Sequence, residues 1–457
     1  MTQPFQTAAR DSRPLAGLAH QSLCCRLHTP ILMSDDHVSS YYAATANPGP
    51  AHPPLGDDIE VDVCVVGGGI SGCSTALHLA ERGYRVALLE GHRIGWGASG
   101  RSGGQAIAGY ACGQQVLEQQ MDEQDARRLW DMSLEALDLL REQVRRHAID
   151  CDLQWGHLHV AVKPRQRDEL QQDMRTLQDR YGYSQLEFLE RSGVEALLAT
   201  QRYCAGVLDR GSGHLHPLNY TLGLAAAAQA AGARLHEHTQ VVSLDLADPA
   251  TLVTTGGRVR ARQVALCCNA YLDGLVPALR ARIMPVATYI IATQTLGEER
   301  MRQLLRENIA VADINFVLDY FRRSQDDRLL FGGRVSYSGH DPFDTARATR
   351  KRMLQVFPQL ADLRIEHAWG GFVDITLNRA PDFGRLAPHI YYLQGFSGHG
   401  IALTGLAGRL IAEAIAGQAE RFDVFSRLRH RRFPGGRLLR TPALMLAMLW
   451  YRLRDLL

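Results

Sequence analysis

The segment that decides the fold is VDVCVVGGGISG, residues 61–72. Its first half is an apolar, largely β-branched run, which is typical of a buried parallel strand. Its second half fits the pattern G-x-G-x-x-G, and apolar residues then recur at helical spacing over residues 70–80. Residues 85–90 predict the next strand. A strand, a glycine loop, a helix and a second strand in this order predict an α/β fold.

The glycines and the start of the predicted helix suit a dinucleotide. Gly67 permits a tight turn, Gly69 lets the backbone approach a pyrophosphate, and Gly72 lets helix and strand pack closely. The first helical residues, Ile70 and Ser71, present free N–H groups and a partial positive charge to phosphates.

Glu90 ends the second predicted strand, where a carboxylate can accept hydrogen bonds from ribose hydroxyls. A glycine pattern alone is weak evidence, because tight turns produce it by chance. Here the strand, the helix and the terminal acid are in register, so the sequence predicts a dinucleotide site.

A second loop rich in glycine and serine, GWGASGRSGGQ, occupies residues 95–105. A surface loop could have this composition, but small residues around one arginine suit close wrapping of a cofactor. The loop resembles the signature of the D-amino-acid-oxidase-like (DAO) flavoprotein superfamily, in which it runs beside FAD. No cysteine or histidine in these motifs favours covalent attachment, so we expect non-covalent FAD. The resemblance assigns to FAD the residues Ala98, Ser99, Gly100, Arg101, Ser102, Gly103, Gly104 and Gln105.

The resemblance extends from about residue 34 to the C-terminus. It implies that the backbone at Val242 contacts the adenine edge. It also implies that the run GFSGHGI, residues 395–401, places the N-terminus of a helix over 402–416 against the flavin edge where negative charge develops on reduction. The cofactor residues implied in this run are Gly395, Ser397, Gly398, His399, Gly400 and Ile401.

Within the superfamily the chain is most similar to γ-glutamylputrescine oxidases. The matching stretches are SSYYAA (39–44), GHLHVAVK (156–163), NFVLDYF (315–321), LLFGGR (329–334) and FPGGRLLRTP (433–442). Ile70, Ser71 and Ser102 differ from the Tyr-Thr and Asn expected there. The resemblance implies oxidative deamination of γ-glutamylputrescine or a related amine, with dioxygen as acceptor and with aldehyde, ammonia and hydrogen peroxide as products.

Two other functions stay open. One is an FAD-dependent oxidase or dehydrogenase of a secondary or D-amino acid. The other is a flavin-binding module without turnover, because a cofactor site alone does not establish catalysis.

Two residues are candidates for catalysis. Trp369, in the motif WGGF at 369–372, would wall an amine pocket by ring-face attraction, and a core tryptophan is the alternative. His399 would hydrogen-bond the flavin or tune the protonation of the amine, and a structural loop histidine is the alternative.

The candidate substrate residues lie on predicted strands. Tyr289 and Phe331 would line the pocket, with core packing as the alternative for each, and Arg334 would bind a substrate carboxylate. The chain has only two lysines, Lys163 and Lys351. Lys163 is therefore a weak candidate for activating oxygen, and a solvated lysine is the alternative.

A length of 457 residues with 46% hydrophobic and 21% charged residues predicts more than one core. We expect an α/β + β fold, with a discontinuous Rossmann-like FAD-binding domain and an interleaved antiparallel-sheet substrate domain. The expected segments are an N-terminal extension and lead-in loop (1–57), the FAD-binding domain (58–110, 205–275 and 366–425), the substrate domain (111–204 and 276–365) and a basic, apolar C-terminal helical tail (426–457).

The two ends of the chain bear on targeting and on membrane contact. Residues 1–32 show no secretory pattern, and Met33 is a plausible alternative start. No run reaches the roughly 18 apolar residues of a membrane span. The tail after residue 426 could touch a membrane surface, but a helix docked on the enzyme body is favoured.

The net charge and the cysteines limit which partners and which cellular compartment the sequence favours. A net charge of +2 gives no support for nucleic-acid binding through bulk charge. The nine cysteines are odd in number and show no C-x-x-C spacing, which favours reduced thiols, no metal site and a cytoplasmic protein.

Overall fold

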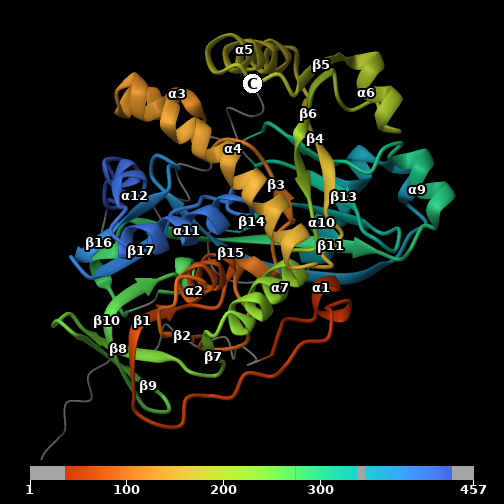
Figure 1. Cartoon of the computed structure of the whole chain (residues 1–457). Helices are drawn as coiled ribbons and strands as arrows, with labels where there is room; N and C mark the ends of the chain where they lie inside the picture. The colour runs from red at the N-terminus through yellow and green to blue at the C-terminus, as the bar shows by residue number, and fades with distance from the viewer. Residues whose placement is uncertain (1–35, 273, 316, 337–344, 435–457) are drawn as a thin grey trace, which may run out of the picture. The chain divides into compact units, whose positions relative to one another are not determined.

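The computed structural model describes residues 36–272, 274–315, 317–336 and 345–434 (Figure 1). The predicted N-terminal extension up to Met33 and the tail beyond residue 434 lie outside the described residues.

The first sheet contains the dinucleotide motif. Its strands are β1 (Ile59–Val66), β2 (Val86–Leu89), β7 (Arg234–His236), β8 (Val241–Asp245), β9 (Ala250–Thr254), β10 (Arg258–Leu266), β16 (Asp382–Ala387) and β17 (Ile390–Gln394). Their order is β16-β17-β10-β1-β2-β7, with β8 and β9 attached to β10. Pairing is parallel from β17 to β7. The predicted parallel strand and its successor are thus both present.

Each face of β1 is covered by a different layer. Val63 and Val65 belong to a core cluster with helices, whereas Cys64 and Val66 belong to a cluster with β9 and β10. All four side chains are buried, which explains the nearly continuous apolar run in the sequence.

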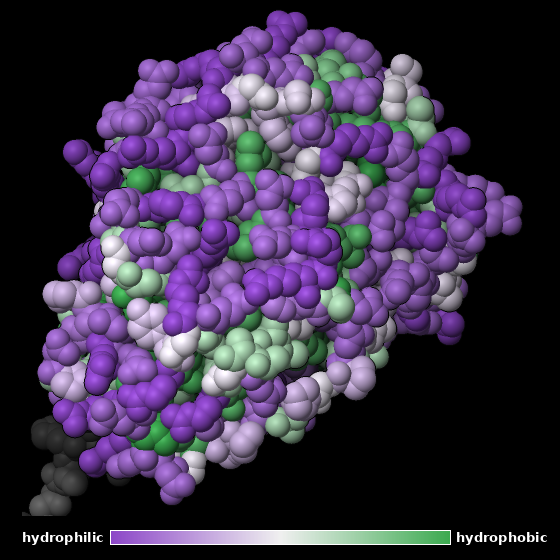
Figure 2. Space-filling view, in the orientation of Figure 1, coloured by the Kyte–Doolittle hydropathy of each residue, from purple (hydrophilic) through white to green (hydrophobic). Residues whose placement is uncertain are grey.

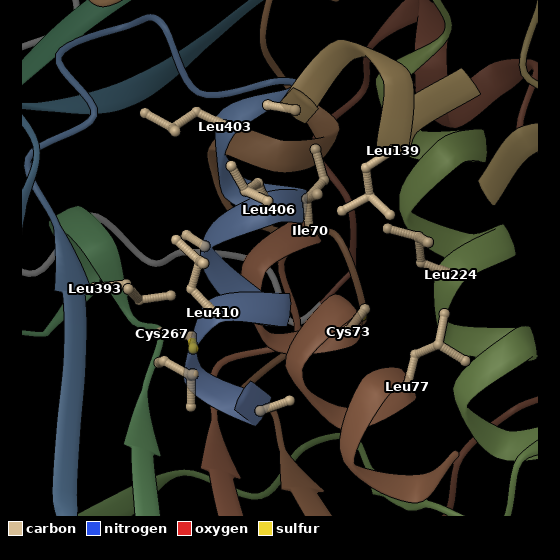
Figure 3. Close-up of a cluster of buried hydrophobic side chains, with 14 of the residues drawn as sticks. Ile70, Cys73, Leu77, Leu139, Leu224, Cys267, Leu393, Leu403, Leu406 and Leu410 are labelled. Atoms are coloured by element: carbon tan, nitrogen blue, oxygen red, sulfur yellow. The ribbon is translucent and has the colours of Figure 1, made fainter. Parts of the chain in front are cut away.

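Four helices form the layer next to Val63 and Val65. They are α2 (Ile70–Ala80), α4 (Glu123–Arg146), α7 (Pro217–Ala230) and α11 (Leu403–Ile415). Figure 3 shows Leu77 from α2, Leu406 and Leu410 from α11, Leu139 from α4 and Leu224 from α7 meeting in one core. Burial of each such side chain contributes about 1.5–3 kcal/mol, so this core fixes the glycine loop at the start of α2.

The second sheet is larger and mostly antiparallel. Within the described ranges it contains β3 (Gln105–Ala106), β4 (Gln154–Ala161), β5 (Leu186–Glu190), β6 (Ala205–His214), β11 (Ile283–Thr293), β12 (Ala310–Asp313), β13 (Tyr320–Arg323), β14 (Leu329–Ser336) and β15 (Ile365–Thr376). The order is β15-β11-β14-β13-β12-β4-β6-β3, with β5 beside β6, and the β12–β4 pair is parallel. The two-sheet α/β + β fold class predicted from the sequence is confirmed.

The sheets exchange segments more than the sequence indicates. Strands β3, β6 and β15 join the second sheet, although their residues fall in segments predicted for the FAD-binding domain. Helix α4 falls in a predicted substrate segment but packs on α11, next to the first sheet. Strand and helix periodicity identifies an element but not its distant pairing partner, so the sequence could not assign these elements to a layer.

The remaining helices lie around the second sheet and at the edges. They are α1 (Tyr41–Ala44), α3 (Gln114–Gln120), α5 (Pro164–Tyr181), α6 (Arg191–Leu197), α8 (Pro277–Arg280), α9 (Glu298–Leu304), α10 (Thr345–Val356) and α12 (Glu420–Ser426). Helix α10 packs on β11, β14 and β15, and α5 packs on β4, β5 and β6.

The face seen in Figure 2 is largely hydrophilic, with hydrophobic residues in small separate areas. Of the described large hydrophobic side chains, those of Val242, Leu246 and Leu377 are exposed. In the part of the chain that the structure describes, every helix is too short or too polar to cross a bilayer.

Gly408 on α11 generates a stability prediction. A Cβ atom there would lie 2.6 Å from the Thr75 nitrogen and 2.7 Å from the Ser71 oxygen, both in the backbone of α2. We expect Gly408→Ala to lower the free energy of unfolding by about 1–3 kcal/mol, measured by thermal or urea denaturation.

The matched control is Gly405→Ala in the same helix, where the nearest atom to the new Cβ would be the Tyr220 hydroxyl at 3.5 Å. This variant should be as stable as the parent or more stable by up to about 1 kcal/mol. Equal stability of the two variants would contradict close α2–α11 packing.

Candidate cofactor and active site

The glycine loop after β1 is held in a shape that side chains would prevent. Gly67 has a φ of +106°, and its N–H donates to the Leu89 carbonyl at 2.8 Å. A Cβ on Gly72 would lie 1.8 Å from the Gly67 oxygen. The tight turn and the close helix therefore both require glycine.

The second glycine loop touches the first. The Ser99 hydroxyl accepts from the Ile70 N–H at 3.0 Å, at the start of α2, where the N-cap Gly69 has no side chain to do so. A Cβ on Gly69 would lie 2.8 Å from that hydroxyl. The predicted cofactor residues of both loops thus meet at one helix N-terminus, which is the place for a phosphate.

Glu90 lies beside these loops with intermediate exposure. Its carboxylate accepts from the Gly68 N–H at 2.6 Å and from the His92 N–H at 2.9 Å. Burial raises its pKa, and these backbone donors oppose the shift. Its role toward a ribose stays a prediction.

The segment before Val242 runs along the same edge. The Thr239 N–H donates to the Glu90 carbonyl and the His238 N–H to the His92 carbonyl, each at 2.8 Å. Val242 is 56% exposed, at a register shift between β8 and β9. The structure therefore leaves an adenine contact at Val242 as a prediction, near the Glu90 edge.

Residues 101–105 cross one face of the second sheet. The Trp369 indole N–H of β15 donates to the Arg101 carbonyl at 2.9 Å. At the other end, the Gln105 amide donates to the Val311 carbonyl of β12 at 3.3 Å. Between them, a Cβ on Gly103 would lie 2.6 Å from the Tyr320 ring of β13. The loop thus links the α2 N-terminus to the second sheet.

Arg101 is a fixed, buried cation with 7% exposure. Its Nε donates to the Trp96 carbonyl at 2.6 Å, and its guanidinium carbon lies 4.1 Å from the centre of the Trp96 ring. The His92 ring stacks on Trp96 at 3.9 Å. Burial lowers the pKa of Arg101.

Three polar atoms on or beside this loop are buried without a hydrogen-bond partner. They are the Arg101 Nη2, the Ser102 hydroxyl and the Tyr271 hydroxyl. Buried polar groups are almost always paired, so these atoms indicate a polar ligand. A cofactor rich in hydrogen-bonding groups, such as FAD, fits this donor set.

Asp374 of β15 joins two further segments. The Gly395 N–H donates to its carboxylate, and the Ser397 N–H donates to its carbonyl at 3.0 Å. The Asn269 amide, with its nitrogen turned toward Asp374, donates at 2.5 Å. Asp374 is 1% exposed, and burial raises its pKa to about 6. The predicted loop 395–401 is therefore fastened to the second sheet just before α11.

His399 fastens the same loop to the end of the Arg101 segment. Its Nε2 lies 3.1 Å from the Ile107 carbonyl and 3.2 Å from the Ala108 carbonyl, so Nε2 carries the proton and donates. Burial lowers the pKa of His399 to about 4, which keeps the ring neutral at pH 7. Gly398, Gly400 and Ile401 follow along the same loop before α11 begins at Leu403.

The predicted substrate residues do not all come together. Trp369 is 5% exposed and packs edge-on against Tyr42, beside the Arg101 loop. Phe331 is fully buried in the core beneath α10, stacked with Phe321. For Phe331 the structure shows the core packing left open above, away from the loop.

Tyr289 and Arg334 are backbone register partners in the β11–β14 pair. Tyr289 is buried on β11 with 4% exposure, and the Arg334 side chain lies outside the described residues. Lys351 is exposed on α10, and Lys163 is the N-cap residue of α5. Contacts of these four residues with substrate or oxygen stay predictions.

Sequence reasoning missed several residues that the structure brings to the loops. Asp374 follows the motif at 369–372 on the same strand, and the sequence offers no signal that it joins Gly395. The alternating histidines of GHLHV did offer a signal, because residues two apart on a strand share a face. The residues added by the structure are Trp96, His157, His159, Tyr271, Tyr320 and Asp374.

Two interlocked glycine loops, a helix N-terminus and unpaired buried donors define a flavin-dinucleotide-binding protein. The family described as FAD dependent oxidoreductase (DAO) matches residues 62–414. The chain belongs to this family of FAD-dependent oxidoreductases, and the predicted resemblance is confirmed.

Similar proteins agree with this assignment. Gamma-glutamylputrescine oxidoreductase of Escherichia coli (strain K12) is 44% identical over 421 residues, which cover 92% of this chain and 99% of that protein. The probable oxidoreductase OrdL of Haemophilus influenzae is 40% identical over 425 residues, which cover 92% and 98%. Glycine oxidase from Geobacillus kaustophilus has the same fold, with a TM-score of 0.69 and 23% identity over 81% of this chain and 99% of that chain.

Asp374 generates a pH prediction. Its folded-state pKa of about 6 lies above the ordinary aspartate value of 3.8, so its contribution to stability is present below pH 3.8 and lost as pH rises through 6. Asp374→Asn cannot ionise. We expect its stability relative to the parent to rise between pH 4.5 and 7.5, on the order of 1–3 kcal/mol, in urea denaturation with saturating FAD.

The control for this prediction is Asp138→Asn on α4, whose exposed side chain is paired with Arg141. Its stability relative to the parent should vary little over the same range. A pH-independent difference for Asp374→Asn would contradict a buried carboxylate that ionises near pH 6.

Proposed function

We propose that this FAD-dependent oxidoreductase oxidises the primary amine of γ-glutamylputrescine or a close relative. The observation that carries the proposal is the 44% identity to gamma-glutamylputrescine oxidoreductase across 92% of the chain. That likeness covers the second sheet as well as the cofactor loops. The products would be the γ-glutamylated aminoaldehyde, ammonia and hydrogen peroxide, with dioxygen as acceptor.

Bound FAD would supply the acceptor for the hydride from the carbon next to the amine. The first sheet and its loops would hold the cofactor, and the second sheet would hold the substrate. The residues that would contact FAD are Gly67, Gly69, Ile70, Ser71, Gly72, Glu90, residues 98–105, Val242, Gly395, Ser397, Gly398, His399, Gly400 and Ile401.

The fixed groups of the chain suit this chemistry. Arg101 and the N-terminus of α11 place positive charge where an electron-rich group would be stabilised. His399 is neutral and already donates to two carbonyls, which fits non-covalent cofactor binding. Trp369 and the loop at 101–105 would keep bulk water away from the reacting carbon.

We further infer a cytoplasmic enzyme. The seven cysteines in the described ranges are free thiols, four of them buried, which fits a reducing compartment.

The test is anaerobic reduction of the purified holoenzyme, followed by flavin absorbance. We expect γ-glutamylputrescine to bleach the flavin faster than putrescine, D-amino acids, glycine or L-proline. Admitting air should restore the absorbance and release one peroxide per amine oxidised.

Each alternative has its own outcome in this panel. Bleaching by a secondary or D-amino acid alone would replace the proposed substrate class. Slow recovery in air would indicate a dehydrogenase, and no bleaching by any amine would indicate a flavin-binding module without turnover.

A further inference from the structure

Two histidines of β4, His157 and His159, lie against the end of the cofactor loop. They are two residues apart on one strand, so their rings share a face of the sheet, and the ring centres are 4.4 Å apart. The His157 Nε2 lies 3.3 Å from the Gln105 amide oxygen, the last residue of the predicted FAD loop. The pair therefore borders the site already described.

His399 completes a group of three imidazoles from separate segments. It interacts electrostatically with both His157 and His159, and burial lowers the pKa of all three rings. All three are therefore neutral at pH 7, and each neutral ring has one nitrogen that can accept a proton.

The three rings differ in their hydrogen bonds and in their exposure. His399 is committed to the Ile107 and Ala108 carbonyls. His157 is fully buried and bonded to Gln105. His159 keeps intermediate exposure, and no described residue hydrogen-bonds its ring. Of the three, His159 is the ring that a small ligand could reach.

Two further groups act on the neighbouring rings and not on His159 itself. The charge of Arg379 lowers the pKa of His399. His214 of β6 lowers the pKa of His157. β12 presents Ala310 and Ala312 opposite the pair.

The nearby carboxylates are engaged elsewhere. Asp209 of β6 raises the pKa of His159, but its oxygens already accept from the Ser212 hydroxyl, the Tyr183 hydroxyl and the Gly211 N–H. Asp173 of α5 interacts with Glu169 rather than with the histidines. The described groups thus offer an ammonium no free carboxylate here.

We propose that His159 accepts the proton of the substrate ammonium, and that His157 is a positioning residue that holds the His159 ring. The proposal rests on the proposed amine substrate. It extends that function by naming the group that generates the reactive form of the amine.

The step is a proton transfer, and nothing is oxidised or reduced in it. An N–H bond of the ammonium breaks, its electron pair stays on the amine nitrogen, and an N–H bond forms on the His159 ring. A free alkylamine has a pKa near that of lysine, about 10.4, far above imidazole. Burial lowers the pKa of both groups, and a desolvated ammonium can fall to about 5–6, so the transfer becomes feasible. The partial exposure of His159 then gives the proton a route to water.

The test is the pH dependence of anaerobic flavin reduction in His159→Gln. The parent enzyme should keep its second-order rate constant from pH 9 to below pH 6.5 and lose it only in more acidic solution, where His159 becomes protonated. The variant can use only amine that is already neutral, so its rate constant should rise about tenfold per pH unit up to the amine pKa. At pH 7 the expected loss is about 1,000-fold, and it should vanish near pH 10.

The matched control is His147→Gln, at the end of α4, which should follow the parent profile. FAD content and melting temperature establish that the variants fold. Parallel profiles of His159→Gln and the parent at every pH would overturn the proposal.

A second measurement does not need turnover. An amine whose α-carbon carries no hydrogen binds without being oxidised, and calorimetry in two buffers counts the protons released. We expect the parent to release about one proton per amine at pH 8, because His159 passes the proton of the ammonium on to water. Release of no proton would mean that the parent binds the amine as its ammonium, and that would overturn the proposal. If no amine bleaches the parent flavin, the proposed function fails separately from this count.

Discussion

Everything at the site depends on one loop that bonds to both sheets. Ser99 caps α2 of the first sheet, the Arg101 carbonyl accepts from Trp369 of the second, and Gln105 continues into β3. A loop held at both ends cannot drift, so a cofactor bound to it has a defined place relative to the substrate sheet. Positioning of this kind is what flavin chemistry requires from a protein, because the reacting atoms belong to cofactor and substrate.

The lysines and Arg101 occupy different places relative to this loop. Both lysines lie on helices packed against the second sheet or at their caps, whereas the Arg101 guanidinium is buried between Trp96 and the loop. A guanidinium stays charged when buried, where an ammonium readily loses its proton. The site therefore has a permanent cation in Arg101 and neutral imidazoles in the histidines, two kinds of group with different tasks.

The local parts of the fold were predictable, and the long-range pairings were not. The motif at 61–72 predicted β1, the glycine turn and α2, because strand and helix periodicity and glycine geometry are local properties. The fastening of Gly395 by Asp374 is not local, since the two residues come from different sheets. The burial of Phe331 also depends on α10, which the pattern of β14 does not reveal.

The candidate site divides in the same way. Glycine loops carry a signature, so the cofactor residues could be proposed from sequence. Residues that lie beside the cofactor loop on a strand, such as His157 and Tyr320, are recognised only when the face of the strand that meets the loop is known. Alternation in GHLHV indicated that the histidines share a face but not which face it is.

The interleaving of strands has a consequence for how the molecule can be divided. Because β3, β6 and β15 leave the first sheet's segments to join the second, and α4 returns to pack on α11, the backbone passes between layers repeatedly. A cut between residues 110 and 111, or between 365 and 366, would leave each fragment with unpaired strand edges and an uncovered apolar face. The described residues of the two sheets form one compact unit, so we expect that a partner domain could be added at surface loops but not inserted at the junction of the sheets.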